Sequence, residues 1–596
     1  MPENILIAIA WPYANAEIHV GNITGSHLPG DIVARYHRLK GNKVLMVSGT
    51  DSHGTPVTIR ADAEGKPVEA VYKYFHDTFL DVFQGYGITY DLFTSTHTEN
   101  HFKVSQSIFL ALKENGYLYT EIRPQWYSPT AAKFLPDRYV EGTCYICGYE
   151  GARSDQCDRC GNVLEPEKLV NPRSKVDNST PELRETEHYF LDLSKLESKV
   201  ADFLRARQSY WRETVSGQSL GQIESDGLKP RPITRDLDWG IPVPEEGWES
   251  KRIYVWFEAV IGYLSAAIEW GQVSGTGNAW RDWWTNPAAK SFYFIGKDNI
   301  FFHAAWWPAQ LMGAGKAFMK IFAEEEAALT LPYDVPANQF MNLEGEKISG
   351  SRNWAVWGRD ARTRYDPDAL RYYLTINMPE AKDSDWSWDD FVARNNNELV
   401  ATWGNLANRV LSFAFKHWDG HVPPVDLNQL READRSLLAV IEDGFKTVGE
   451  FYASVKLRDA LRETMRLATE VNRYLDANAP WTAIKTDRDS AALTIYTALR
   501  AIDTLKVLFA PILPFSSETL HSFFGYDAPL FGEQYTEKVA DALGEHTVLR
   551  YKPVNSGELW QPGGLKPGQP LRQPAPLFKK LDEKLVIPDE LSRLGK

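Results

Sequence analysis

The chain has 596 residues, which is more than one hydrophobic core usually holds, so about three or four structural units are expected. No apolar stretch is long enough to span a bilayer, because the most apolar one, residues 255–270, is interrupted by Glu258 and Glu269. The net charge of −14 disfavours bulk electrostatic binding of nucleic acid, so any RNA contact needs a local basic face.

The N-terminal segment alternates in the manner of an α/β fold. Residues 5–10 form a short apolar run that predicts a buried parallel strand, residues 20–39 predict a helix kinked at Pro29, and residues 44–47 predict a second strand. The first run follows Glu3 rather than a basic region and is short for a signal sequence, so a cytoplasmic location is expected.

Polar residues follow the predicted strands. His19 and Gly21 fall between the first strand and the helix, and Asp51 and His53 follow the second strand. Ligands of open α/β sheets bind at the carboxyl ends of the strands, so His19, Asp51 and His53 are expected at one crevice. A strand that leads through a glycine turn into a helix also favours phosphate, because free backbone N–H groups and the helix dipole face the anion.

Residues 116–230 break this pattern with aromatic strands and polar turns, which predicts an insertion. All four cysteines of the chain lie there with the spacing C-x2-C-x9-C-x2-C, as Cys144, Cys147, Cys157 and Cys160. The spacing predicts a zinc site, which is structural because four thiolates leave no open coordination position. Gly148 and Gly161 follow the second cysteine of each pair, where a positive φ lets the backbone turn around a metal. Two disulfides are the alternative, which a reducing cytosol disfavours.

The second half of the α/β domain is expected to resume after the insertion. Residues 253–257 and 292–295 predict strands, and the second strand runs directly into the turn 296–298. Farther along, Lys347 has two glycines and two hydroxyls as neighbours, Gly345, Gly350, Ser349 and Ser351. A glycine-flanked lysine predicts a mobile loop that places a positive charge opposite the first phosphate site. We therefore expect a nucleotide between the halves of a split domain, with charge stabilisation rather than a covalent nucleophile.

Beyond residue 394 the apolar pattern becomes helical. Leu399, Leu406, Val410 and Phe413 fall on one helical face, and similar stripes recur to residue 508, which predicts a helical bundle. Residues 553–576 are rich in proline and glycine and predict a surface loop, and the last residues, 577–596, predict a short helix at most.

Several motifs occur in an order that is specific to one family. They are PYAN at 12–15, HVGN at 19–22, GTDSHGTP at 49–56, the cysteine knuckle, VWFEAVIGY at 255–263, FIGKDN at 294–299 and KISGS at 347–351. In order and spacing the chain resembles the methionyl-tRNA synthetase family of class I aminoacyl-tRNA synthetases, from about residue 5 to about residue 580.

The resemblance implies an α/β fold with a split Rossmann-type parallel-sheet catalytic domain, a zinc-knuckle insertion and an α-helical bundle anticodon-binding domain. The implied boundaries are 1–115 and 231–345 for the two catalytic halves, 116–230 for the connective insertion, 346–393 for the KMSKS-type loop and stem-contact region, 394–552 for the helical domain and 553–596 for a C-terminal tail.

The implied activity is that of a methionine–tRNA ligase. Such an enzyme activates L-methionine with ATP to methionyl-adenylate and transfers it to the 3′-terminal adenosine of tRNA(Met), releasing AMP and pyrophosphate. The implied cofactors are one structural Zn²⁺ on the four cysteines and Mg²⁺ with ATP. No membrane or DNA partner is expected, and a monomer is favoured.

The resemblance also implies roles for single residues around ATP. His19 resembles the first histidine of the HIGH signature, and Lys347 the first lysine of the KMSKS loop, and both are implied to be catalytic. Asn22 and Gly350 depart from these signatures, where the family usually has histidine and a second lysine. Asp298 could instead cap the following helix. The implied ATP-binding residues are His19, Gly21, Asn22, Asp298, Lys347, Ser349 and Ser351.

The implied methionine-binding residues are mostly aromatic, which suits a polarisable thioether that is only a weak acceptor. They are Trp11, Tyr13, Asp51 for the α-amino group, Trp256, Ala259, Tyr263, Asn299, His303 and Trp307. His303 could instead be a satisfied core histidine. Trp11, Glu258, Val260 and Asn299 differ from the residues more common in the family, so a smaller or more polar pocket is expected.

In the helical domain Asn405, Arg409 and Trp481 resemble the residues that read the CAU anticodon, by stacking on an aromatic ring and by hydrogen bonds to base edges. Asn405 and Arg409 are four residues apart and so share a helical face. Interhelical hydrogen bonds for this pair and core burial for Trp481 are the alternative.

Two other functions stay open. A class I synthetase for leucine, isoleucine or valine would carry a large editing insertion, for which 116–230 is too short, and one for cysteine would bring zinc within reach of the substrate. A catalytically weakened relative that binds tRNA or ATP is kept open by Asn22 and Gly350.

Overall fold

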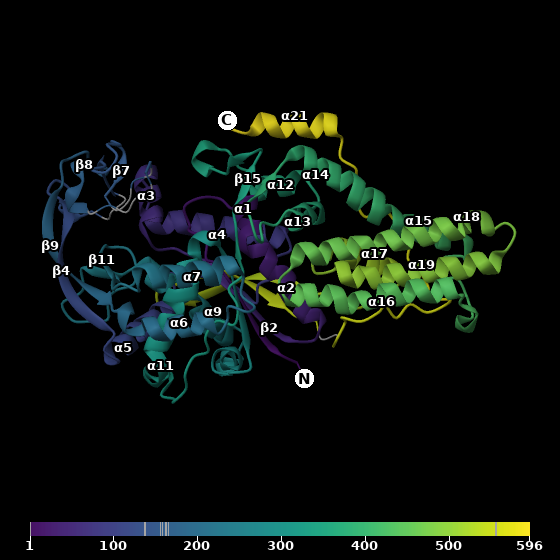
Figure 1. The fold of residues 1–596 in the computed structure, drawn as a ribbon, viewed down its shortest axis with the longest axis horizontal. Coiled ribbons are helices and arrows are strands. Elements are labelled where there is room, and N and C mark those ends of the chain that lie inside the picture. Colours follow the sequence, from purple (N-terminus) through teal and green to yellow (C-terminus); the bar gives the residue numbers. More distant parts are fainter. Residues whose placement is uncertain are drawn as a thin grey trace.

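The computed structural model describes residues 2–135, 139–154, 157, 159–160, 164, 166–554 and 557–595. A central α/β body lies between the insertion on one side and the helical bundle on the other (Figure 1). Among the helices in these described ranges, none has the length and apolar composition needed to cross a bilayer.

The central sheet has seven strands in the order β14-β13-β1-β2-β3-β19-β18. The first five pair in parallel: β14 (Ala337–Asn338), β13 (Lys290–Gly296), β1 (Asn4–Ile9), β2 (Lys43–Thr50) and β3 (Leu92–Ser95). The predicted strands at 5–10, 44–47 and 292–295 are thereby confirmed, and they come from both sides of the insertion.

Both faces of this sheet are buried, which explains the continuous apolar runs of the parallel strands. Ile5, Ile7 and Ile9 of β1 point into a core shared with α2 (Leu28–Leu39), α4 (Val68–Gly85) and the helical bundle. The alternate residues Leu6 and Ala8 point into a second core with α5 (Glu99–Glu114), α9 (Gly262–Val273) and α11 (Trp307–Ala323). Side chains of one strand thus support both layers of helices.

Two strands of the sheet lie where only helices were predicted. β18 (Glu533–Asp541) and β19 (Gly544–Lys552) form a hairpin, and β19 pairs antiparallel with β3. The segment 394–552 is therefore not wholly helical, because its last part completes the catalytic sheet.

The predicted helix at 20–39 is present, with a π-helical turn shortly before Pro29. It begins as α1 (Val20–Asn22), widens into a π-helical turn at Ile23–His27 and continues as α2, in whose first turn Pro29 lies. Pro29 has no N–H to donate to the preceding turn, whose geometry is π-helical rather than α-helical. A second π-helical turn, Phe302–Trp306, precedes α11.

The segment 253–257 is only in part a strand. β12 (Lys251–Ile253) pairs with β11 (Thr234–Asp236) and ends at residue 253, and the next residues form α8 (Val255–Ala259). The strand prediction is therefore wrong for residues 254–257, although their aromatic and β-branched side chains favour strands. Tertiary contacts of Glu258, described below, override that preference.

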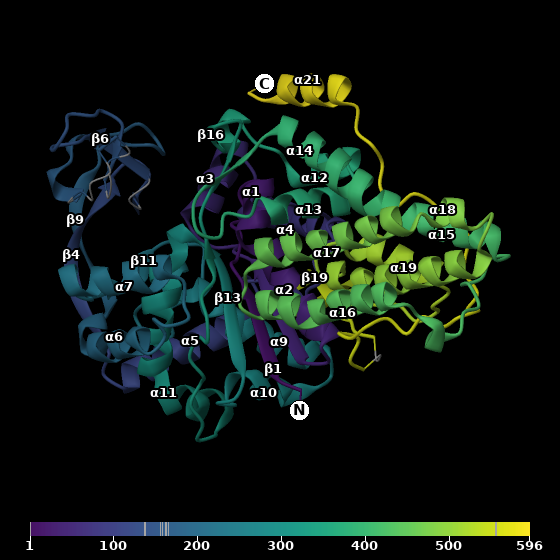
Figure 2. The same cartoon turned by 45° about the vertical axis from the view of Figure 1, so that its right-hand side comes forward.

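The insertion consists of two small antiparallel sheets and two helices. The long strands β4 (Leu118–Ser128) and β9 (Glu182–Leu191) form an arm, flanked by β5 (Lys133–Phe134) and β10 (Arg231–Pro232). The arm leads from the body to the knuckle strands β6 (Val140–Thr143), β7 (Ala152–Arg153) and β8 (Val170–Ser174), as Figure 2 shows. The helices α6 (Glu197–Arg205) and α7 (Glu213–Asp226) return to the body.

Residues 405–523 form a helical bundle, as predicted. Its helices are α15 (Asn405–His417), α16 (Glu432–Ala453), α17 (Leu457–Asn478), α18 (Pro480–Ala483), α19 (Arg488–Phe509) and α20 (Pro514–Phe523). Before it lie β15 (Met341–Leu343), β16 (Glu346–Lys347), β17 (Ser384–Trp386), α12 (Gly358–Arg364), α13 (Pro367–Ile376) and α14 (Trp388–Arg394). The last helix, α21 (Glu583–Arg593), lies beside α14 (Figure 1).

A buried ion pair joins the bundle to the α/β body. Arg371 of α13 donates to Asp31 of α2 at 2.7 Å, and both side chains are fully buried. The guanidinium also donates to the carbonyls of Tyr86, Pro511 and Ile512. A buried charge needs such complete pairing, so this contact fixes the two parts relative to one another.

Candidate active site

A cavity of about 590 Å³ opens at the carboxyl ends of β1, β2 and β13, where the sequence predicted a crevice. It brings together most of the predicted ligand-binding residues, from segments up to 336 positions apart. Those on its wall are Trp11, Tyr13, His19, Gly21, Asn22, Asp51, Trp256, Ala259, Tyr263, Asp298, Asn299, His303 and Lys347. His53 was expected at the same crevice, but it lies behind the wall and is only 1% exposed.

His19 and Asn22 cap the start of the helix reciprocally. The Asn22 backbone N–H donates to His19 Nδ1 at 3.3 Å, and the His19 N–H donates to Asn22 Oδ1 at 3.1 Å. Burial lowers the pKa of His19 to about 4, so its ring is neutral at pH 7. Because Nδ1 accepts, the ring proton is on Nε2, which makes His19 a hydrogen-bond donor for a ligand. Asn22 keeps this tautomer without adding charge.

The lysine segment lies against the His19 turn. The Val20 N–H donates to the Val356 carbonyl at 3.0 Å, and His19 pairs with Trp357 as an isolated β-bridge. Ile348 closes on Gly21, since an added Cβ there would come within 3.2 Å of its Cδ1. The His19 turn and the lysine segment therefore meet at Gly21, where a side chain would have to displace the His19 ring or Ile348.

Lys347 reaches the cavity from β16 with its ammonium exposed. Its Nζ lies 5.5 Å from the centre of the Phe340 ring, and its charge opposes the rise that burial causes in the pKa of Asp298. No ion pair of Lys347 occurs among the residues that the structure describes. The preceding Gly345 has a φ of 79°, a conformation that favours glycine and shapes the turn into β16.

Three predicted ligand residues do not line the cavity. The hydroxyls of Ser349 and Ser351 are 3.3 Å apart and contact each other. Trp307 is fully buried one layer behind the wall, where its indole N–H donates to the Tyr293 hydroxyl at 3.2 Å. Tyr293 in turn packs edge-on against Tyr263, so Trp307 supports the wall indirectly.

Aromatic rings form one side of the cavity. Trp256 stacks on Phe302 with ring centres 4.4 Å apart and meets Tyr13 edge-on at 5.9 Å. Trp11 meets Tyr263 edge-on at 6.5 Å and fills the space over Gly49 and Gly262, since a Cβ on either glycine would collide with its indole. Such a wall favours an apolar, polarisable ligand group.

His303 is both a cavity residue and a satisfied histidine. Its Nδ1 donates to the Asn299 carbonyl at 2.9 Å, which can only accept, so Nε2 accepts from the Tyr263 hydroxyl at 2.6 Å. Burial lowers the pKa of His303 to about 4, so it is neutral at pH 7. The ring therefore orients Tyr263 and contributes no charge.

Three buried polar atoms on the wall have no hydrogen-bond partner within the described chain. They are Asp51 Oδ1, Asn299 Oδ1 and Trp11 Nε1. Burial, together with the charge of Glu258, raises the pKa of Asp51 well above its usual range, and a hydrogen bond from the His53 backbone opposes this rise. An unpaired buried carboxylate is costly, so Asp51 is arranged to receive a cation.

Some lining residues were missed by sequence reasoning. Gln339, Phe340 and Met341 directly follow β14, at the carboxyl end of a parallel strand. β14 has only two residues, too few to leave an apolar pattern. Ile348 and Trp357 also line the cavity and flank the signature lysine segment, so proximity to Lys347 was the available signal.

The four cysteines converge on one point, with their sulfur atoms all within 4.8 Å of one another. Cys144 and Cys160 have sulfurs 4.0 Å apart, and those of Cys147 and Cys157 are 3.6 Å apart. Tetrahedral zinc with Zn–S bonds of about 2.3 Å requires sulfurs about 3.8 Å apart, whereas a disulfide needs about 2.05 Å. The set therefore fits one structural Zn²⁺ and not two disulfides.

The knuckle has its predicted turn and a contact with the body. Gly148 has a φ of 73°, as predicted, whereas Gly161 lies outside the described residues. The Tyr139 hydroxyl lies 2.9 Å from Thr58 Oγ1 and 3.4 Å from Asp62 of α3 (Thr55–Glu64), the helix that follows the Asp51 loop. The knuckle is thus linked to an element next to the cavity.

Removing zinc should abolish most tRNA charging, because the small core around the knuckle depends on the metal. Amino-acid activation should fall less than charging. Charging and ATP–pyrophosphate exchange would be compared before and after chelation, with added Zn²⁺ as the control for reversibility. Unchanged charging by protein shown to be zinc-free would exclude this role.

The predicted anticodon residues lie on the bundle, far from the cavity. The Arg409 guanidinium lies over the Trp481 ring at 5.3 Å, and it donates to Asn472 Oδ1 at 2.9 Å. Phe413 meets Trp481 edge-on at 5.0 Å, and Asn405, at the start of α15, is exposed. An aromatic ring with an arginine over it can receive an unstacked base.

The split parallel sheet, the connective insertion and the two signature segments at one cavity define a class I aminoacyl-tRNA synthetase. A family model described as tRNA synthetases class I (M) matches residues 5–411. A second, described as the anticodon binding domain of methionyl tRNA ligase, matches residues 425–552.

Similar proteins narrow the class to one family. The chain is 51% identical to the methionine–tRNA ligase of Thermomicrobium roseum over 596 residues, covering 100% of this chain and 99% of that one. It is 51% identical to that of Roseiflexus sp. over 603 residues, with the same coverage of 100% and 99%. A structure of Mycobacterium tuberculosis methionyl-tRNA synthetase in complex with methionyl-adenylate superposes with a TM-score of 0.75 at 25% identity, covering 97% of this chain and 100% of that one. The chain belongs to the methionyl-tRNA synthetase family, whose members are ATP-dependent ligases.

Proposed function

We propose that the protein activates L-methionine with ATP and transfers the methionyl group to the 3′-terminal adenosine of tRNA(Met). The methionine carboxylate attacks the α-phosphorus, the bond to the β-phosphate oxygen breaks and pyrophosphate leaves. The terminal ribose hydroxyl then attacks the adenylate carbonyl, and AMP leaves. Both steps depend on positioning and charge stabilisation, so no enzyme nucleophile is needed.

One observation carries this proposal: a single cavity is lined by the buried carboxylate of Asp51, by aromatic rings and by the turn at His19 that begins a helix. We assign the wall of Trp11, Tyr13, Trp256 and Tyr263 to the methionine side chain and Asp51 to its ammonium group. Asn299 Oδ1 offers a second acceptor in the same wall. An α-amino acid with an apolar side chain matches this set of groups.

The triphosphate is assigned to the His19 turn and Lys347. His19 Nε2–H donates to phosphate oxygens at the positive end of the helix, and Lys347 approaches from the opposite side. Asp298, which lines the same wall, is assigned to the ATP ribose. Mg²⁺ accompanies ATP as part of the substrate. Asn405, Arg409 and Trp481 are assigned to the anticodon. A cytoplasmic location is part of the proposal because zinc-binding thiolates are stable in a reducing compartment. The proposal also includes a monomeric state.

ATP–pyrophosphate exchange with each of the twenty amino acids tests this function. Only methionine should support rapid exchange. Rapid exchange with leucine, isoleucine, valine or cysteine would replace the assignment by another class I synthetase, and no exchange with any amino acid would indicate a relative that binds without activating.

The methionine affinity should depend on pH because of Asp51. Its raised pKa means that the carboxylate is ionised only above the elevated value, and it loses its charge as the pH falls through that value. The KM for methionine should therefore rise as the pH falls through the raised pKa of Asp51, by up to about tenfold per unit, while the methionine ammonium keeps its proton. Steady-state exchange at saturating ATP measures this, with Asp51→Asn as the control that removes the dependence. A KM that is flat or falls with acidification would contradict the role of Asp51.

A further inference from the structure

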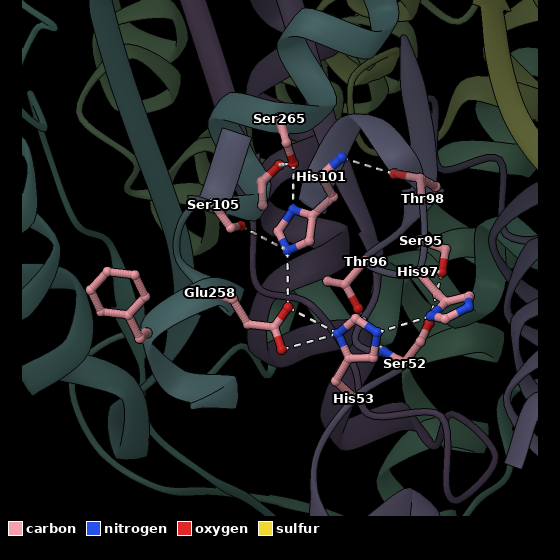
Figure 3. Close-up of polar contacts among 12 residues, drawn as sticks. Ser52, His53, Ser95, Thr96, His97, Thr98, His101, Ser105, Glu258 and Ser265 are labelled. Atoms are coloured by element: carbon pink, nitrogen blue, oxygen red, sulfur yellow. Dashed lines mark hydrogen bonds and ion pairs between the residues drawn. The ribbon is translucent and has the colours of Figure 1, made fainter. Parts of the chain in front are cut away.

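A buried carboxylate, Glu258, precedes the wall residue Ala259, and Figure 3 shows its contacts with His53 and His101. Glu258 of α8 is fully buried, and its oxygens lie 2.9 and 3.0 Å from His53 Nδ1 and 3.2 Å from His101 Nε2. No lysine or arginine pairs with it among the described residues. Burying a carboxylate without a cationic partner costs free energy, which makes a functional role for Glu258 worth testing.

The network fixes the hydrogen positions of both imidazoles. Burial raises the pKa of Glu258 to about 7, against the hydrogen bond from His101, so above that pH Glu258 is ionised and only accepts. His53 then donates through Nδ1 and His101 through Nε2. His101 Nδ1 then accepts from the Ser265 hydroxyl at 2.7 Å, and His53 Nε2 lies 3.1 Å from His97 Nδ1, which donates to it. Burial lowers the pKa of His53 to about 3 and also lowers that of His101, so both rings are neutral.

The same network holds the loop that carries Asp51. His97 stacks on Trp239 with ring centres 4.4 Å apart, and the Trp239 indole N–H donates to the Ser52 carbonyl at 2.8 Å. On the other side, the Asp51 N–H donates to the Pro12 carbonyl at 2.9 Å. The loop is therefore held from the Trp11–Tyr13 segment and from the Glu258 network.

Glu258 also belongs to the opposite wall. It lies between Trp256 and Ala259 of α8, which both face the cavity, whereas His53 lies two residues after Asp51. We propose that Glu258 is a positioning residue, whose carboxylate fixes the distance between the Asp51 loop and helix α8 and so sets the geometry of the ammonium site. This inference rests on the proposed function of the cavity.

The role differs from a general contribution to folding because Glu258 acts on one substrate only. The ATP side of the cavity is formed by the His19 turn and the lysine segment, which the network does not touch. The charge of Glu258 also raises the pKa of Asp51. Removing that charge should move the pH dependence of methionine binding to lower pH, which loss of packing alone would not do.

The test is steady-state exchange by Glu258→Gln. The amide NH2 replaces a carboxylate oxygen that a donating imidazole N–H faces, at Oε1 3.0 Å from His53 Nδ1, so a donor meets a donor and the anchor between the loop and α8 weakens. The KM for methionine should rise about 10- to 100-fold at pH 7.5 while the KM for ATP changes less than about twofold. Glu258→Asp, which keeps a carboxylate, should recover most of the methionine affinity. An unchanged KM for methionine, or equal changes in both KM values, would overturn the inference.

The chain offers a matched control in Glu269 of α9. This carboxylate is 3% exposed and accepts from Thr94 Oγ1 and from His546 Nε2, each at 2.9 Å, but it does not line the cavity. Glu269→Gln should leave both KM values within about twofold of wild type even where it lowers the melting temperature. A methionine KM raised as far as in Glu258→Gln would show that loss of any buried acid has this effect.

A second pair of variants keeps the test decisive if Glu258→Gln does not fold. Asparagine at position 53 can place its amide N–H where His53 Nδ1 lies, whereas leucine removes the donor. His53→Leu should raise the KM for methionine and His53→Asn should not, and the same KM in both would overturn the inference. Failure of the wild-type protein to exchange with methionine would instead refute the proposed function itself.

Discussion

Replacing Lys347 with alanine should slow methionine-dependent ATP–pyrophosphate exchange by about 10²- to 10³-fold and change the methionine affinity by less than about threefold. Charge accumulates on the phosphate oxygens as the adenylate forms, and Lys347 is the ammonium that the signature segment brings to the cavity. Gly350 supplies no charge at the position where the family resemblance implies a second lysine. The loss should therefore lie at the upper end of the range.

Lys297 supplies a matched control. Its Nζ lies 4.3 Å from the same Phe340 ring, but it is ion-paired with Asp383 at 2.7 Å and does not line the cavity. Lys297→Ala should leave the exchange rate within about twofold of wild type. A Lys347→Ala protein that loses methionine binding but keeps its activation rate would contradict the phosphate role of Lys347.

Replacing Trp481 with alanine should depress tRNA charging about 10- to 100-fold with exchange nearly unchanged, because stacking of a base on an aromatic ring is worth about 1–3 kcal/mol. Phe413 and the Arg409 guanidinium both contact the Trp481 ring, so its orientation is fixed before a base binds. Truncating it also leaves Arg409 without its aromatic partner.

The two assays separate recognition from folding. α18, which carries Trp481, lies toward the end of the bundle that is far from the catalytic sheet (Figure 1). A defect in anticodon recognition should therefore leave adenylate formation intact. Equal losses in charging and exchange would mean that Trp481→Ala damages the fold, and unchanged charging would remove Trp481 from the anticodon site.

Sequence reasoning was most reliable where chemistry and backbone pattern coincide. His19, Asp51 and Lys347 come from three distant segments, and each follows or flanks a predicted strand or glycine turn, so one cavity could be expected for them. The spacing of the four cysteines was sufficient to predict the zinc site. Ser349, Ser351 and Trp307 were placed by motif alone, and the side-chain packing that moves them off the wall is not encoded locally.

The errors in the fold share a physical cause, which is that tertiary contacts outweighed local preference. Residues 255–259 favour a strand by composition, yet they form α8, whose Glu258 contacts two histidines from other elements. The hairpin at 533–552 alternates weakly and gains its stability from pairing with β3. The network around Glu258 joins side chains from three separate segments, so its contacts cannot be predicted from a local sequence pattern.

The most direct test of the central claim is a crystal structure of the protein with methionine, Mg²⁺ and a non-hydrolysable ATP analogue. The account predicts that the triphosphate lies between the His19 imidazole and the Lys347 ammonium, with the methionine ammonium on Asp51. A triphosphate bound elsewhere, with Lys347 turned away from it, would contradict the account.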